Sequence, residues 1–102
     1  MKDGDPQPLL LRQEHGPVAR LVLNSPANFN ALSLAMIDAL AQALDQIAAD
    51  DSIRVVILAA TGKAFSAGHD LREMQAARED GDDGRAAYEK LFSRCAAMMQ
   101  KI

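Results

Sequence analysis

The stretch Ile53-Arg54-Val55-Val56-Ile57-Leu58-Ala59-Ala60 decides the fold. It is nearly all apolar, β-branched in its middle and of strand length, and it shows no polar alternation, which is typical of a parallel strand buried on both faces. The loop Thr61 to His69 follows, and a short helix is predicted from Asp70 to about Arg78, with Asp70 and Glu73 spaced as in a capping box. Ligands of α/β sheets bind where a buried strand ends. The loop is therefore the candidate site, where backbone N–H groups and a helix N-terminus could meet an anion or a polarised carbonyl.

The residues before this strand predict a β-hairpin and a helix. Leu9 to Gln13 and Val18 to Leu23 flank a Gly-containing turn in which we expect His15 to be solvated. An Asn-, Ser- and Pro-rich loop follows, and Ser33 is expected to be the N-cap of a helix ending near Asp50-Asp51. The apolar residues of that helix recur at helical spacing: Met36, Ile37, Leu40, Leu44, Ile47 and Ala48. The element order is thus β-β-α-β.

The residues after the loop predict a solvated acidic linker, Glu79 to Gly84, and a last helix. That helix carries an apolar stripe from Tyr88 to Ile102. Cys95 lies on the stripe, and we expect a buried structural thiol rather than a nucleophile, because no base is placed near it by the sequence.

Composition limits the function classes. The chain has 102 residues, 49% of them hydrophobic, and a net charge of −3, which fits one domain at most and argues against a nucleic-acid or anionic-membrane surface. One cysteine excludes a disulfide framework and a zinc cluster and suggests a reducing compartment. No apolar run could span a bilayer, and residues 1–8 read as a disordered lead-in without a targeting signal, so a cytoplasmic protein is predicted. No metal-ligand pair or Gly-rich nucleotide loop occurs, and Ser66 lacks the nucleophile elbow.

Four motifs in register resemble one family over residues 9–102. Ala64-Phe65-Ser66-Ala67-Gly68-His69-Asp70-Leu71 is similar to the first signature of the crotonase, or enoyl-CoA hydratase/isomerase, superfamily. Three upstream pieces resemble its other N-terminal motifs, and they are Leu21 to Pro26, Asn30 to Ser33 and Asp51 to Leu58. The resemblance implies an α/β fold, the N-terminal portion of a crotonase-like ββα spiral with hairpin, helix, buried strand, oxyanion loop and helices.

The resemblance also assigns site residues. The backbone N–H of His69 matches one donor of the family's oxyanion hole, while its side chain is expected to pack at the pocket rim rather than act as a base. The expected partner is an acyl-CoA thioester, with coenzyme A as part of the substrate and no separate cofactor. Positions matching its CoA-binding surface are Ala27, Phe29, Ala31, Ala67, Gly68, Asp70, Leu71 and Arg72. Ala27 stands where many members carry a basic residue facing the CoA phosphates.

The remaining family motifs have no match in this sequence. The second oxyanion donor and the two glutamates that hydratases use as acid and base would lie beyond residue 102, and neither Glu73 nor Glu89 matches them. We therefore expect residues 9–102 to form the N-terminal part of a domain whose C-terminal part is absent. The resemblance implies a full-length enzyme that hydrates 2-enoyl-CoA and forms trimers or hexamers, and a 102-residue chain that is inactive alone.

Two other interpretations stay open. The chain could be a non-catalytic interaction or regulatory domain that self-associates through the Tyr88–Ile102 stripe. Alternatively, it could be an α/β domain whose loop at residues 61–70 is only a tight connection. The sequence does not separate hydratase from isomerase or hydrolase chemistry.

Overall fold

One three-stranded sheet in the order β1-β2-β3 forms the base of the computed structural model, which describes residues 8–79 and 81–102. Strands β1 (Leu10–His15) and β2 (Val18–Leu23) are antiparallel, with Leu10 opposite Leu23 and His15 opposite Val18. The two-residue connection contains Gly16, whose φ of 58° is one that glycine adopts without steric cost. The predicted hairpin is confirmed, except that His15 ends a strand rather than sitting in the turn.

Strand β3 (Val55–Ala60) runs parallel to β2, with Val18 opposite Val55 and Leu23 opposite Ala60. The prediction that this strand is buried on both faces is wrong, since Val55, Val56 and Ile57 are 51%, 37% and 46% exposed. The physical reason is its position at the edge of the sheet. An apolar run is compatible with burial, but it does not itself supply the neighbours that would cover it.

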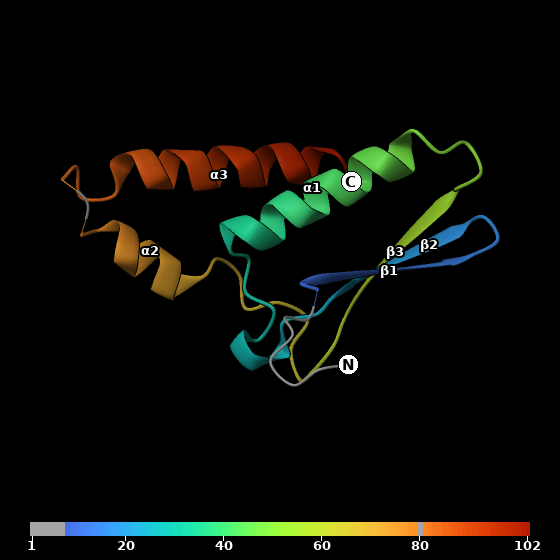
Figure 1. Ribbon diagram of the computed structural model, residues 1–102, viewed down its shortest axis with the longest axis horizontal. Coiled ribbons are helices and arrows are strands. Elements are labelled where there is room, and N and C mark those ends of the chain that lie inside the picture. The colour runs from blue at the N-terminus through green and yellow to red at the C-terminus, as the bar shows by residue number, and fades with distance from the viewer. Residues whose placement is uncertain (1–7, 80) are drawn as a thin grey trace.

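Helix α1 (Leu34–Ala48) covers the sheet and begins as predicted, because the Ser33 hydroxyl oxygen accepts from the Met36 N–H at 3.1 Å. Helix α3 (Arg85–Gln100) packs along α1, and Figure 1 shows the two helices side by side. The core joins one face of β2 to these helices, and its buried members are Ala19, Leu21, Leu23, Met36, Ile37, Leu40, Ala43, Leu44, Ile47, Leu91, Cys95 and Met98. Ala48, expected on the apolar face, is exposed.

The apolar stripe of α3 is used largely within the chain. Leu91, Cys95 and Met98 are buried against the core, whereas Phe92 and Met99 are about half exposed. The expected burial of the Cys95 thiol is confirmed. Because α1 already covers the centre of the stripe, those residues do not need a second copy of the chain to bury them.

Two short elements complete the chain: the 3-10 helix η1 (Pro26–Asn28) and helix α2 (Leu71–Ala77). The lead-in predicted for residues 1–8 falls almost wholly outside the described residues. Within the described ranges, no helix is long and apolar enough to cross a membrane. The same residues hold no cluster of three or more metal-ligating side chains.

Candidate functional site

Asn30 is the anchor of the site. It is fully buried and joins two loops, because its Nδ2 donates to the Thr61 and Ala64 carbonyl oxygens at 2.7 and 2.9 Å and its Oδ1 accepts from the Ser25 N–H at 2.7 Å. Its φ is 54°, a left-handed conformation that asparagine tolerates better than most residues. The loop after β2 is thereby fixed to the loop after β3.

Ser66 makes a second connection between the same two loops. Its hydroxyl donates to the Asn30 carbonyl oxygen at 2.9 Å and accepts from the Gly68 N–H at 3.2 Å. The Ala67 N–H donates to the Phe29 carbonyl oxygen at 3.0 Å. Ser66 therefore bridges the two loops.

A single parallel β-bridge pairs Leu32 with His69, and it determines which way the backbone N–H of His69 points. The Leu32 N–H donates to the Gly68 carbonyl oxygen at 2.6 Å, and the Asp70 N–H donates to the Leu32 carbonyl oxygen at 3.4 Å. In extended backbone, successive N–H groups point to opposite sides. The His69 N–H therefore points away from Leu32, and it takes part in none of the hydrogen bonds found among the described residues.

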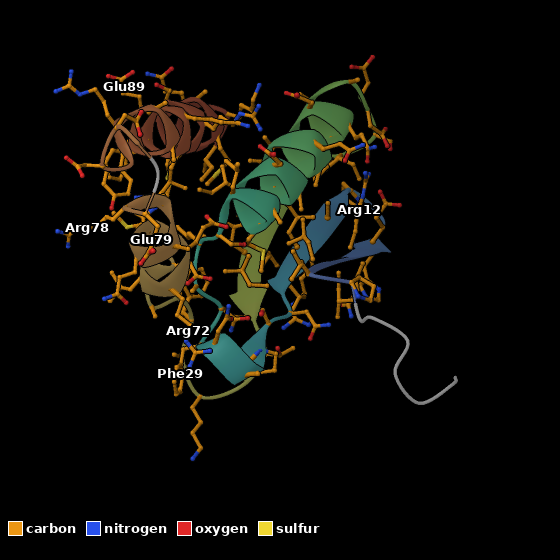
Figure 2. The ribbon with its side chains drawn as sticks, turned by 60° about the vertical axis from the view of Figure 1, so that its left-hand side comes forward. Arg12, Phe29, Arg72, Arg78, Glu79 and Glu89 are labelled. Atoms are coloured by element: carbon orange, nitrogen blue, oxygen red, sulfur yellow. The ribbon has the colours of Figure 1, made fainter. Side chains whose placement is uncertain are left out.

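The residues predicted for the CoA-binding surface gather around one cavity of about 330 Å³. Eight of the nine predicted site residues line it, and Gly68, the ninth, lies on the adjoining cavity described below. Figure 2 shows Phe29 and Arg72 beside one another at the end of the molecule where the two loops meet. The lining residues are Ala27, Asn28, Phe29, Ala31, Ala67, His69, Asp70, Leu71 and Arg72. The structure brings these positions together, and their role in binding stays a prediction.

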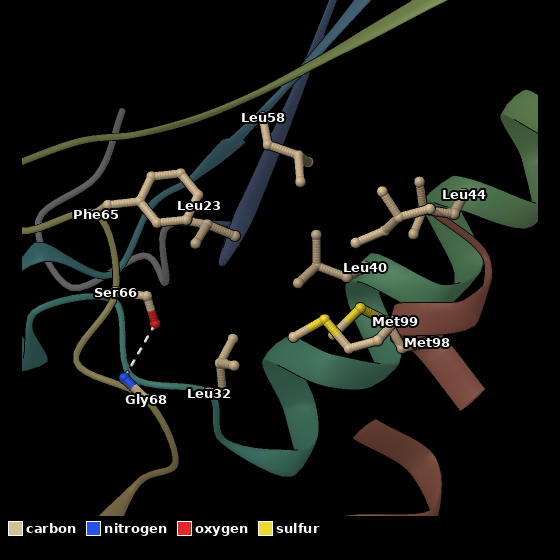
Figure 3. A pocket seen from close by; sticks show the side chains of 11 residues that line it. Leu23, Leu32, Leu40, Leu44, Leu58, Phe65, Ser66, Gly68, Met98 and Met99 are labelled. Atoms are coloured by element: carbon tan, nitrogen blue, oxygen red, sulfur yellow. Dashed lines mark hydrogen bonds between the residues drawn. The ribbon is translucent and has the colours of Figure 1, made fainter. Parts of the chain in front are cut away.

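A second cavity, of about 340 Å³, opens on the other side of the loop and is lined almost entirely by apolar groups (Figure 3). Leu58 of β3, Leu40 and Leu44 of α1, and Met98 and Met99 of α3 meet there. Ser66 and Gly68, joined by the hydrogen bond drawn in Figure 3, form its edge toward the site.

Asp70 and Glu73 cap two different helices. Asp70 Oδ1 accepts from the N–H groups of Arg72 and Glu73 at 3.0 and 3.3 Å, so the predicted N-cap of α2 is confirmed. The predicted reciprocal box is wrong, because Glu73 Oε1 accepts from the Leu34 N–H of α1 at 2.8 Å. The capped N–H groups of Arg72 and Glu73 are thus occupied, which removes the anion site expected at this helix N-terminus.

The His69 side chain packs as expected at the rim of the cavity. Its ring meets the ring of Phe92 edge-on, with centroids 5.2 Å apart and planes inclined by 67°. Tyr88 lies next to Phe92, with ring centroids 6.3 Å apart, and its hydroxyl donates to the Met74 carbonyl oxygen at 2.8 Å. Helix α3 thereby supports both the imidazole and α2.

The structural roles of Asn30 and Ser66 were not predicted from the sequence. Both stand inside the family-like motifs, but the hydrogen bonds by which they join the two loops span 31 to 36 positions and leave no local pattern. The one available signal for Asn30 was an asparagine in a loop flanked by apolar residues, which is typical of a left-handed position.

Comparison with known proteins matches this arrangement to one family. The sequence profile described as enoyl-CoA hydratase/isomerase matches residues 18–102. The Xenopus laevis protein named enoyl-CoA hydratase domain-containing protein 3, mitochondrial, is 40% identical over 90 residues, covering 88% of this chain and 29% of that protein. An enoyl-CoA hydratase structure from Mycobacterium smegmatis has a TM-score of 0.85 and 52% identity, covering 94% of this chain and 36% of that one. The human enoyl-CoA hydratase domain-containing protein 3 structure has a TM-score of 0.80 and 28% identity, with coverage of 93% and 36%.

The predicted cytoplasmic location is contradicted by these relatives. The enoyl-CoA hydratase domain-containing proteins 3 of frog, zebrafish, human, rat and mouse are all named mitochondrial. The prediction rested on finding no apolar run that could span a bilayer and no targeting signal in residues 1–8, and on a single cysteine, which argues only for a reducing compartment and does not distinguish one such compartment from another.

The chain spans about a third of the length of the proteins it matches. The motif Ser66-Ala67-Gly68-His69-Asp70-Leu71, with histidine after the glycine, resembles most the branch of enoyl-CoA hydratase domain-containing protein 3, and the sequence relatives agree. On the profile match, the shared α/β fold and these relatives together, the chain belongs to the enoyl-CoA hydratase/isomerase family, the crotonase superfamily, as its N-terminal part.

Proposed function

We propose that this chain supplies the first oxyanion donor and part of the CoA-binding surface of an enzyme that hydrates 2-enoyl-CoA. The observation that carries the proposal is the His69 N–H, which points out of the Leu32–His69 bridge beside the 330 Å³ cavity and meets no acceptor among the described residues. A backbone donor held in this way needs no reorganisation when charge develops on a ligand oxygen.

The donor acts on the thioester carbonyl oxygen. When water adds to an enoyl thioester, the water oxygen bonds to C3 and one of its O–H bonds breaks, while the C2–C3 π electrons move through C2 onto the carbonyl oxygen. A proton, balancing the one lost by the water, is then added at C2 and the carbonyl is restored. A hydrogen bond to that oxygen stabilises the enolate-like transition state more than the ground state. Removing one such donor costs on the order of 3–4 kcal/mol of transition-state stabilisation.

The cavity supports recognition of the CoA moiety as part of the substrate, with no further cofactor. Ala27, Phe29 and Leu71 offer apolar contact, and Arg72 offers a guanidinium that pairs well with phosphate oxygens. With Ala27 at a position that is basic in many members, Arg72 is the one cationic side chain among the residues lining this cavity.

The acid–base step is assigned to parts of the full-length protein outside these 102 residues. The Glu73 carboxylate accepts a hydrogen bond from the Leu34 N–H, and Glu89 is exposed on α3 (Figure 2). Neither is therefore assigned to the activation of water at His69. We therefore expect the 102-residue chain to bind acyl-CoA without hydrating it. The full-length protein is proposed to be a mitochondrial homo-oligomer, a trimer or hexamer.

Binding and polarisation test the proposal together. We expect calorimetry to detect butyryl-CoA binding to the chain and isotope-edited infrared spectroscopy to record a lowered stretching frequency of its ¹³C-labelled carbonyl. Enoyl-CoA hydration should be absent for this chain and present for a full-length protein. No binding at millimolar butyryl-CoA, or binding with an unshifted carbonyl band, contradicts the proposed role of His69.

A further inference from the structure

His69 holds the one buried side-chain nitrogen without a hydrogen-bond partner among the described residues, its Nδ1. A buried polar atom without a partner costs stability, and native structures contain few of them. A residue needed only for its backbone N–H could carry a small apolar side chain at no such cost. The imidazole therefore needs a role of its own.

The surroundings of the ring select which nitrogen is the donor. The aromatic ring of Phe92 packs edge-on against the imidazole, and no acceptor reaches Nδ1. A buried N–H without an acceptor is less well tolerated than a buried lone pair. The arrangement thus favours the tautomer with the lone pair on Nδ1 and the hydrogen on Nε2.

Nε2 is the reachable edge of the ring. It makes no hydrogen bond within the described chain and is not among the buried unpartnered atoms, so it is open to the surroundings. The residue lines the 330 Å³ cavity together with Asp70 and Arg72. His69 therefore carries two donors without a partner among the described residues, its backbone N–H and its Nε2–H, and the residue lines this cavity.

We propose that the His69 imidazole is a specificity-determining group that donates a hydrogen bond from Nε2 to an oxygen on the third carbon of a bound acyl group. The inference rests on the proposed function, since the backbone N–H must hold the thioester carbonyl for the third carbon to lie beside the ring. The favoured ligand class is the 3-oxygenated acyl-CoA, such as the 3-hydroxyacyl product of enoyl hydration. Phe92 positions the ring without touching the ligand.

Nitrogen NMR tests this on the unaltered chain. The sequence has two histidines, and the exposed His15 serves as an internal control. We expect the free chain to show the Nε2–H tautomer at His69. Saturating 3-hydroxybutyryl-CoA should shift the His69 Nε2 resonance, butyryl-CoA should shift it much less, and neither should move His15. Equal shifts with both thioesters, or the Nδ1–H tautomer, would overturn the inference.

Affinity ratios give the second arm. His69→Phe keeps an aromatic ring against Phe92 and removes the donor, and His15→Phe makes the same change at an exposed position. In His69→Phe, the ratio of 3-hydroxybutyryl-CoA to butyryl-CoA affinity should fall about five- to tenfold, the effect of one net hydrogen bond. In His15→Phe the ratio should hold. An unchanged ratio in His69→Phe contradicts the inference but leaves the proposed function standing, whereas failure of the wild-type chain to bind butyryl-CoA contradicts both.

Discussion

Two regions of this molecule are held together by different forces. The region formed by β2, α1 and α3 is closed by apolar side chains, with Leu21, Met36 and Ile37 fully buried. The region where the loops after β2 and β3 cross is closed by hydrogen bonds, among them those of the Asn30 and Ser66 side chains. The stability of the first region therefore depends on how well side-chain volume fills the core, whereas the stability of the second depends on where single polar atoms are placed.

The largest expected effect is a cavity in the apolar region. Leu21→Ala removes a fully buried side chain and should lower the free energy of unfolding by about 4 kcal/mol. Urea unfolding followed by circular dichroism measures it. The matched control is Leu71→Ala, whose side chain is 75% exposed and whose loss should change stability by less than about 0.5 kcal/mol. Similar losses in both variants would contradict the assigned core.

In the hydrogen-bonded region, a substitution of Asn30 should lower the free energy of unfolding. Asn30→Ala removes two donors and one acceptor and should cost about 3 kcal/mol, because the Ser25 N–H and two carbonyl oxygens lose their partner. Asn30→Gly removes the same bonds without the strain of a left-handed φ, so it separates the two causes. If the glycine variant restored full stability, backbone strain rather than hydrogen bonding would explain Asn30.

A side chain at Gly62 should also weaken the contact between the two loops. A Cβ there would lie 2.7 Å from Pro26 Cβ, and the φ of 81° is unfavourable for any L side chain. Gly62→Ala should cost about 2 kcal/mol in unfolding free energy. Gly16→Ala is the control, because Gly16 has a positive φ of 58° with nothing within 4 Å. Equal costs would mean that the close approach to Pro26 adds nothing.

The smallest expected effect is a pH dependence at the start of α3. The N–H of Ala86, and then that of Gly84, donates to the Asp82 carboxylate and lowers its pKa below the ordinary value. A lowered pKa in the folded state means that this contribution is complete above the ordinary pKa and is lost as the pH falls through the folded one. The protection factors of the amides in the first turn of α3, which correct for the intrinsic pH dependence of exchange, should fall on acidification, and should fall less in Asp82→Asn. Identical acid profiles for both proteins would show that the Asp82 carboxylate does not stabilise this turn.

Local features of this fold were predictable from the sequence, and distant ones were not. The Ser33 and Asp70 caps and the hairpin depend on residues a few positions apart, so their patterns appear in the chain. The exposure of β3 depends on a neighbour in space, and the contact from Glu73 to Leu34 spans 39 positions. The nine site positions came from the resemblance rather than from periodicity, and the crossing held by Asn30 explains why separate segments reach one cavity.

The lone bridge between Leu32 and His69 should leave a signature in hydrogen–deuterium exchange. The Leu32 and Asp70 amides are bonded across it, whereas the His69 amide between them faces outward. Three amides within one small patch should therefore exchange unequally, with Leu32 and Asp70 slow and His69 fast. A thioester that occupies the outward position would slow the His69 amide above all, which turns one backbone hydrogen into a direct reporter of occupancy.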